Sequence, residues 1–231
     1  MGTPNLEILA YDETPLGTLC LRRRELLNEP GTIVTEVSLN QEFLMSSYHT
    51  ASERALAEIG VRLRAGTGLD VLVGGLGLGY TAREALRSER VAKVEVVELL
   101  PQVIGWLKDG LIPLAAELAA DSRLKLVEGD VYRRLSAPPA ELYDVVLIDV
   151  DHSPEERLAD GQAPFYEEEG LAKAKRHLKP GGILGVWSYA ESSPFAVALR
   201  KTFPEVRVEP VEFFNKFVGA SQTDWLFFAR A

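Results

Sequence analysis

The pattern of hydrophobic and polar positions changes near Asp70. Before it, short strand-like segments at residues 6–10, 17–21 and 32–37 are separated by turn residues, which predicts a small antiparallel sheet. After it, continuous apolar runs such as residues 144–148 are typical of strands buried on both faces. The chain therefore divides into a β-rich beginning and a longer segment with a different organisation.

The longer segment alternates between strand and helix patterns. Strands are predicted at residues 70–73, 93–98, 124–128, 143–150 and 182–187, with helices at 81–88, 103–108, 114–120, 166–178 and 195–203. Such alternation indicates a doubly wound, mainly parallel sheet with right-handed crossovers. The last strands, at 206–213 and 225–229, have no helix between them and predict an antiparallel hairpin at one edge. We expect an α/β protein with a small N-terminal domain at 1–48 and a Rossmann-like domain at 49–231.

A possible helix start precedes this second segment. Thr50-Ala-Ser-Glu53 fits a capping box, in which the Thr50 and Glu53 side chains bond the amides of the first turn. This pattern favours Glu53 as a helix cap over Glu53 as a catalyst.

A glycine-rich loop follows the strand at residues 70–73. Gly75, Gly77 and Gly79 have no Cβ, so the chain can bend sharply there and a ligand can approach the backbone closely. A strand, a glycine turn and a helix in succession place a helix N-terminus beside exposed backbone, which suits a nucleotide-like ligand. Alone, this pattern fits a structural turn equally well.

Acidic residues follow three strands of the predicted parallel sheet. Glu98 is placed to accept hydrogen bonds from ribose hydroxyls, Asp130 to accept one from an adenine amine, and Asp149 to face the cleft mouth. A single acid at such a position is typically a helix cap. Three in succession after a glycine loop indicate a ligand site.

A nicotinamide dinucleotide is an alternative ligand. Gly77-Leu-Gly79-Tyr-Thr-Ala82 satisfies the G-x-G-x-x-A pattern, with Glu98 at a suitable distance downstream. However, this match starts late relative to its strand, and it gives no role to Asp130 or Asp149.

Composition narrows the function further. The 231 residues carry a net charge of −9, which argues against binding to a nucleic-acid backbone and is compatible with a cationic substrate. Cys20 is the single cysteine, so we expect a reducing, cytoplasmic environment. No leader or membrane span is expected.

The basic run Arg22-Arg-Arg24 is predicted to be a solvated strand edge rather than a phosphate site.

Several blocks together resemble the spermidine and spermine synthases, a family of class I AdoMet-type transferases. The resemblance extends over most of the chain, and its last block is shared by many methyltransferases. The blocks are Val71-Leu-Val-Gly-Gly-Leu-Gly-Leu-Gly-Tyr-Thr-Ala-Arg-Glu-Ala-Leu86, Val96-Val-Glu98, Asp121-Ser-Arg-Leu-Lys-Leu-Val-Glu-Gly-Asp130, Tyr143-Asp-Val-Val-Leu-Ile-Asp149 and Leu178-Lys-Pro-Gly-Gly-Ile183.

The resemblance implies a donor and a set of roles. The donor would be S-adenosylmethionine (AdoMet) or its decarboxylated form, with no metal. The three glycines would line the nucleoside, Glu98 the ribose, and Asp130 with Val131 the adenine. Asp149 would lie beside the attacking amine of a small, cationic acceptor, and residues 151–165 would gate the acceptor pocket. The family commonly forms homodimers, so a homodimer is expected here.

The acceptor side departs from the family pattern. Leu78 stands where aminopropyltransferases carry an acid in the glycine loop, and His152 stands where the second acid of D-x-x-D-P belongs. His152 is a second catalytic candidate, either as a base, as a pocket wall or as a lid residue. Further candidate substrate contacts are Asp151, Gln41 and Tyr189.

These departures favour methyl transfer over aminopropyl transfer, because an apolar Leu78 cannot pair with the ammonium of decarboxylated AdoMet. Aminopropyl transfer in polyamine synthesis is the alternative. An NAD-dependent enzyme and a non-catalytic relative stay open as further alternatives.

Overall fold

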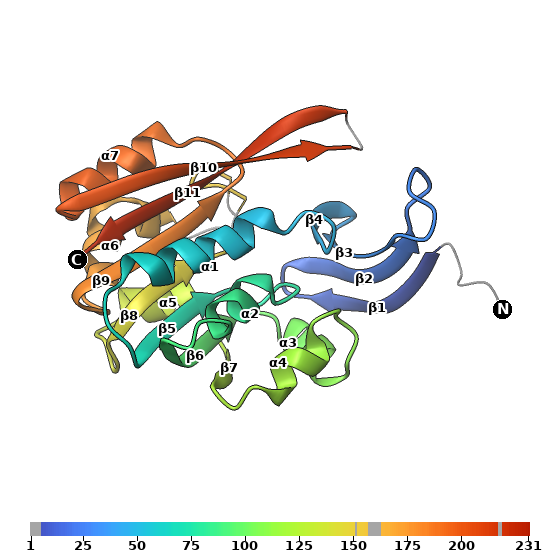
Figure 1. Ribbon diagram of the computed structural model, residues 1–231, viewed down its shortest axis with the longest axis horizontal. Helices are drawn as coiled ribbons and strands as arrows, with labels where there is room; N and C mark the ends of the chain where they lie inside the picture. The colour runs from blue at the N-terminus through green and yellow to red at the C-terminus, as the bar shows by residue number, and fades with distance from the viewer. Residues whose placement is uncertain (1–5, 151, 157–162, 217–218) are drawn as a thin grey trace.

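The computed structural model describes residues 6–150, 152–156, 163–216 and 219–231. Two sheets dominate it, a small one at the N-terminus and a larger one that carries the helices (Figure 1). The larger sheet combines a parallel centre with one antiparallel edge, so the predicted α/β class with a separate N-terminal sheet is confirmed.

The N-terminal sheet is a four-stranded antiparallel meander. Its strands, in spatial order, are β1 (Leu6–Thr14), β2 (Gly17–Glu25), β3 (Ile33–Leu39) and β4 (Glu42–Ser46). Asn40 and Gln41 both have positive φ and form the tight turn between β3 and β4. The sequence reading missed β4. It was also wrong about Arg22-Arg-Arg24, because β2 is an inner strand and these residues do not lie on an edge.

The larger sheet has the strand order β10-β11-β9-β8-β5-β6-β7. Strands β9, β8, β5, β6 and β7 run parallel, whereas β11 pairs antiparallel with both β9 and β10. The predicted edge hairpin is therefore confirmed. The strand bounds are β5 (Leu69–Gly74), β6 (Val91–Glu98), β7 (Leu124–Glu128), β8 (Tyr143–Ile148), β9 (Leu178–Ser188), β10 (Glu205–Asn215) and β11 (Ala220–Arg230).

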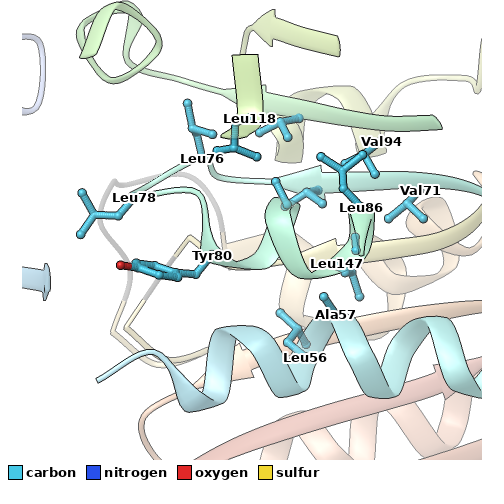
Figure 2. Packing of buried hydrophobic residues seen from close by; sticks show 14 of the residues in the cluster. Leu56, Ala57, Val71, Leu76, Leu78, Tyr80, Leu86, Val94, Leu118 and Leu147 are labelled. Carbon is cyan, nitrogen blue, oxygen red and sulfur yellow. The ribbon is translucent and has the colours of Figure 1, made fainter. Parts of the chain in front are cut away.

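Helices cover both faces of this sheet. Alternate residues of β5 point to opposite faces, so Val71 and Val73 pack into one core and Leu72 into the other. The first core contains α1 (Ala51–Leu63), α2 (Tyr80–Leu86), α3 (Pro101–Lys108) and α4 (Ala115–Ala120), and Figure 2 shows part of it. The second contains α5 (Val131–Ser136), the 3-10 helix η1 (Ala163–Tyr166), α6 (Glu168–Lys175) and α7 (Ser193–Thr202).

Three local expectations were wrong. Helix α5 was not predicted, since six residues are too few to show a helical period. The predicted helix at 166–178 ends at Lys175, because Leu178 begins β9 and pairs with Tyr143. The Thr50 side chain makes no capping bond to α1, so the proposed capping box does not form.

The strand order determines where a crevice for a ligand forms at the ends of the strands. β6 lies on one side of β5 and β8 on the other, so the chain connections diverge at this point and leave a crevice at the strand ends. Gly75 follows β5 and Asp149 follows β8 at this crevice. Met45 of β4 packs over it, with its sulfur 2.8 Å from the point where a Cβ on Gly77 would lie. The N-terminal sheet therefore closes the crevice from above the glycine loop.

Candidate active site

A cavity of about 540 Å³ opens at this crevice. Its described walls come from the N-terminal sheet with the adjoining start of α1, from the glycine loop, from the segment after β8, and from the β9–β11 region. In Figure 2, Leu78 and Tyr80 project from the loop on one side, and both residues line this cavity. A smaller pocket of about 90 Å³ shares Gly77 and Asp149 with it and extends toward Glu98 and Asp130.

The glycine loop requires its glycines. Gly75 has φ +91°, and a Cβ there would lie 2.3 Å from the carbonyl oxygen of Asp149. Gly79 has φ +90° as the N-cap of α2, and its Cβ would lie 2.4 Å from Leu118. Backbone conformation disfavours a side chain at both positions, and at Gly75 the Asp149 carbonyl also leaves no space for one. The loop therefore presents bare backbone to the smaller pocket and to the cavity.

Glu98 fixes the shape of that loop. Its Oε2 accepts from the Leu76 amide at 2.8 Å and its Oε1 from the Leu100 amide at 2.9 Å, so the carboxyl bridges the loop to the start of α3. Burial raises the pKa of Glu98, while these backbone amides act in the opposite direction. Glu98 lines the smaller pocket, where a lone pair could accept from a ribose hydroxyl; its ribose role stays a prediction.

Asp130 and Val131 form the far side of the smaller pocket. Asp130 caps α5, with Oδ1 accepting from the Tyr132 amide at 2.8 Å and from the Arg133 amide at 3.1 Å. The cap uses one carboxylate oxygen and leaves the other available to a ligand amine. Val131 packs against Gly74 behind the glycine loop. Both residues lie where the adenine was expected, and that assignment stays a prediction.

Asp149 lies where the two pockets meet. It is half-buried, and its Oδ2 accepts from the Thr81 hydroxyl at 2.5 Å. Burial raises the pKa of Asp149 to about 6, and the Thr81 bond acts against this rise. A carboxylate that is shielded from water is stabilised more strongly by a nearby cation than a fully solvated carboxylate is.

Two further acids line the cavity near Asp149. Glu53 comes from the first turn of α1, and Asp224 comes from β11. The Ser52 hydroxyl connects them, at 2.6 Å from Asp224 Oδ2 and 3.1 Å from Glu53 Oε2. A hydroxyl has a single proton to donate. Both bonds can form together only when one carboxyl is protonated, which in this pair is the one with the higher pKa.

Electrostatics identify Glu53 as the protonated member. Burial, followed by the charge of Asp149, raises the pKa of Glu53 to about 8. Burial also raises the pKa of Asp224, but the hydrogen bond from Ser52 opposes the rise. Without a cation the cluster therefore keeps a proton on Glu53 at neutral pH, and an entering cation favours its release.

Not every residue expected at the acceptor side lies in the cavity. His152 and Tyr189 do line it, and the Tyr189 amide donates to the His152 carbonyl at 3.0 Å. Gln41 lies in the exposed β3–β4 turn and is absent from the described cavity walls, so its expected substrate contact is not supported. Asp151 and much of the expected gating segment lie outside the described residues.

The sequence reading missed Glu53 and Asp224 as site residues. Glu53 was attributed to a capping box that does not form, and Asp224 lies 172 positions from Ser52, the residue that it contacts. The available signal for Asp224 was an acid directly before the apolar run Trp225-Leu-Phe-Phe228 of a predicted strand.

The strand order, the parallel centre and the antiparallel edge hairpin define a Rossmann-like methyltransferase fold. The spermine/spermidine synthase domain matches residues 50–195, which is more than half of the chain. The chain belongs to the spermine/spermidine synthase family. This membership disfavours the NAD-dependent alternative.

Curated relatives include two kinds of transferase. Polyamine aminopropyltransferase 2 of Streptomyces coelicolor is 34% identical over 118 residues, covering 50% of this chain and 21% of the relative. Polyamine aminopropyltransferase of Prochlorococcus marinus (strain MIT 9312) is 28% identical over 158 residues, covering 68% and 51%. Putrescine N-methyltransferase 2 of Nicotiana tabacum is 35% identical over 124 residues, covering 53% and 32%. The chain spans about half or less of the length of these relatives.

Solved structures share the fold over almost the whole chain. A spermidine synthase in complex with the transition-state analogue AdoDATO superposes with a TM-score of 0.76 at 20% identity, covering 96% of this chain and 73% of that one. The spermidine synthase of Thermotoga maritima gives a TM-score of 0.73 at 19% identity, covering 96% and 72%. Among the described residues, no helix combines the length and hydropathy that a membrane-spanning segment requires.

Proposed function

We propose that this protein is an AdoMet-type transferase that alkylates a small amine, with aminopropyl transfer from decarboxylated AdoMet as its main reaction. The observation that carries the proposal is the convergence of Glu53, Asp149 and Asp224 on one cavity that adjoins the glycine-loop pocket. Three carboxyls with restricted access to water favour a cationic ligand. Family membership and the aminopropyltransferase relatives support the same reaction class.

The acid cluster changes the argument that favoured methyl transfer. Leu78 gives the ammonium of decarboxylated AdoMet no anion in the glycine loop. Leu78 does line the cavity, but Glu53, Asp149 and Asp224 line it too and supply anions from other elements. These acids are candidates for the partner that the glycine loop does not provide. We now place aminopropyl transfer first.

In the proposed mechanism the smaller pocket holds the adenosyl group. Glu98 and Asp130 would bind its ribose and adenine, and the bare backbone at Gly75 and Gly77 allows close approach. When bound, the donor supplies a sulfonium-activated carbon with a thioether as leaving group. The protein's part is mainly to align the acceptor nitrogen with that carbon and to exclude water.

The acids would act on the acceptor. An ammonium must lose a proton before its nitrogen can attack, and the proton passes to a carboxylate of the cluster and then to solvent. Asp149, positioned by Thr81, would orient the nitrogen and stabilise the charge that develops on it as the new carbon–nitrogen bond forms. The pKa of Glu53 is raised to about 8, which brings it closer to that of an amine than an ordinary carboxyl would be.

A direct assay tests the proposal. The purified protein is incubated with putrescine and either decarboxylated AdoMet or AdoMet, and products are separated by mass spectrometry. Methylthioadenosine with an aminopropylated amine supports aminopropyl transfer. The Asp149→Asn variant is expected to lose at least about a hundredfold in rate, comparable to other losses of electrostatic stabilisation. Asp109→Asn, at an exposed position after α3, is the matched control.

Methyl transfer is the second candidate. Leu78 at the family's acidic position and the putrescine N-methyltransferase relatives favour it. S-adenosylhomocysteine and a methylated amine would identify this reaction in the same assay. No product with either donor across an amine panel would overturn both candidates and favour a non-catalytic relative. The homodimer and the cytoplasmic location stay predictions.

A further inference from the structure

An aromatic wall lines part of the cavity and has no role in the proposed transfer chemistry. It consists of Trp187 on β9, Phe213 on β10 and His49 just before α1. The centroids of the His49 and Phe213 rings are 4.9 Å apart. Burial lowers the pKa of His49, so its neutral form is favoured at neutral pH. The wall therefore presents mainly apolar surface to the cavity.

Strand register places this wall directly beside Asp224. β11, which carries Asp224, lies between β9 and β10. Trp187 pairs with Leu226 and Phe213 pairs with Gln222, and these partners lie two residues to either side of Asp224. Residues two positions apart on a strand share a face, and so do directly paired residues. Trp187 and Phe213 therefore flank Asp224 on the face that lines the cavity, each as a diagonal neighbour on an adjacent strand.

The three acids gather at one place next to this wall. The Ser52 hydroxyl connects Glu53 with Asp224. The Thr81 hydroxyl lies 2.5 Å from Asp149 Oδ2 and 3.4 Å from the Glu53 carbonyl oxygen. Two hydroxyls thus link all three acidic residues, and this cluster is the part of the cavity that favours an ammonium.

The described cavity walls offer a second ammonium no comparable place. Glu36 is the one further acid among the described lining residues, and it lies on β3 of the N-terminal sheet. Its carboxylate accepts from Arg22 Nε and from Arg24 Nε, each at 2.9 Å. A second ammonium would have to compete there with two guanidiniums that already bind this carboxylate.

We propose that the acceptor is a monoamine with an apolar body, such as an alkylamine or an arylalkylamine, rather than a linear diamine. Its ammonium binds among Glu53, Asp149 and Asp224, and its body packs on the aromatic wall. The inference rests on the proposed function and narrows its acceptor class.

Burial decides between the two kinds of acceptor. Apolar surface gains free energy on leaving water, so an alkyl or aryl body is stabilised against Trp187 and Phe213. A second ammonium at the same place loses hydration without gaining a carboxylate. The cavity of about 540 Å³ lies in the range of sites that hold drug-sized ligands, so it has room for a phenyl ring. The transfer step stays as proposed: the amine nitrogen bonds to the donor carbon as the carbon–sulfur bond breaks, and the ammonium proton passes to the acid cluster.

The test compares a matched pair of amines. Hexylamine and cadaverine have chains of equal length, and a methyl group in hexylamine replaces the second ammonium of cadaverine; phenethylamine adds a ring. Affinities are measured by calorimetry with methylthioadenosine present, and kcat/KM is measured with decarboxylated AdoMet and with AdoMet. Each is repeated with Phe213→Ala. The control is Phe214→Ala, the next residue of β10, which points to the opposite face and is 57% exposed.

We expect hexylamine to bind at least about tenfold more tightly than cadaverine, and phenethylamine to bind at least as tightly as hexylamine. Phe213→Ala should weaken phenethylamine binding about tenfold, and Phe214→Ala should leave it unchanged. Cadaverine binding as tight as that of hexylamine or tighter, or phenethylamine binding unchanged by Phe213→Ala, would overturn the inference. The comparison of amines on the parent protein needs no variant, so it decides the question even if Phe213→Ala does not fold.

Two outcomes separate this inference from the proposed function. Faster transfer to cadaverine than to hexylamine would overturn the inference and leave the proposed function standing. Phe213-dependent binding of hexylamine without transfer from either donor to any amine would refute the proposed function and leave the monoamine site standing.

Discussion

Replacing Glu53 with glutamine tests whether this carboxyl is protonated in the folded protein. The pKa of Glu53 rises from the usual 4.5 to about 8 on folding. The folded protein therefore binds more protons than the unfolded chain between these two pH values. The free energy of unfolding must fall as pH rises through this interval, because the proton stabilises the folded state. The glutamine side chain cannot titrate, so its contribution is independent of pH.

The structure sets the size of this effect. A rise from 4.5 to about 8 corresponds to at most about 5 kcal/mol across the whole interval. Two factors reduce this value. The cavity admits water to Glu53, and the charge of Asp149, which contributes to the raised pKa of Glu53, itself changes with pH because the pKa of Asp149 is about 6. Between pH 6 and pH 9 we therefore expect about 1–2 kcal/mol. Glutamine keeps a donor toward Ser52, as the protonated carboxyl does, so Glu53→Gln should match the parent within about 0.5 kcal/mol at pH 6.

Urea denaturation at pH 6, 7, 8 and 9 measures the difference. We expect the parent to lose about 1–2 kcal/mol relative to Glu53→Gln between pH 6 and pH 9, so that the variant is the more stable protein at pH 9. Glu58→Gln, on the same helix and with a side chain that is 63% exposed, is the control and should run parallel to the parent. Parallel profiles for the parent and Glu53→Gln would show that Glu53 is ionised throughout, and the proton assignment in the acid cluster would be wrong.

Other predictions concern the donor side. Asp130→Asn should keep the α5 cap and change stability by less than about 0.5 kcal/mol, while Asp130→Ala should cost about 1 kcal/mol, and both should weaken methylthioadenosine binding about tenfold by calorimetry. Equal affinities would remove Asp130 from the adenine site. Glu98→Gln should leave one loop amide without its acceptor, costing about 1–3 kcal/mol by urea denaturation. Gly75→Ala should lower the melting temperature by about 4 °C or more, because its Cβ meets the Asp149 carbonyl; an unchanged melting temperature would contradict the required loop conformation.

The carboxyls that follow the parallel strands could be predicted from local sequence. Glu98, Asp130 and Asp149 each follow a buried strand, and parallel strands bring their carboxyl ends to one edge of the sheet. The connection order therefore places these residues together before any side-chain packing is considered. The edge hairpin could also be predicted from local sequence, because no helical pattern separates the segments that form β10 and β11.

The cavity residues contributed by α1, β11 and the N-terminal sheet could not be predicted in this way. Glu53 and Asp224 meet through Ser52 because α1 packs against the C-terminal hairpin, and no local pattern encodes that contact. Arg22 belongs to a sheet whose Leu19, Leu21 and Val37 pack into the core shared with α1 to α4. Tertiary contacts place Arg22, Glu53 and Asp224 at the cavity. The acids that follow the parallel strands are placed by the hydrophobic pattern and by their position at a strand end.

The hairpin β10–β11 reaches past the larger sheet toward the N-terminal sheet (Figure 1), and Lys216 on it pairs with Glu29 at 2.5 Å. The N-terminal sheet and this hairpin thus both contribute walls to the cavity where the proposed acceptor would bind, while most of the smaller pocket proposed for the donor is formed by the intervening βα units. Leu19, Val37, Leu44 and Met45 of the N-terminal sheet also line the smaller pocket, whereas the described lining of that pocket includes no residue of β10 or β11. Substitutions in the hairpin can therefore change the cavity while the smaller pocket keeps its walls. A library restricted to Arg22, Arg24, Glu53 and Asp224, which line the cavity and are absent from the described walls of the smaller pocket, would test this separation directly.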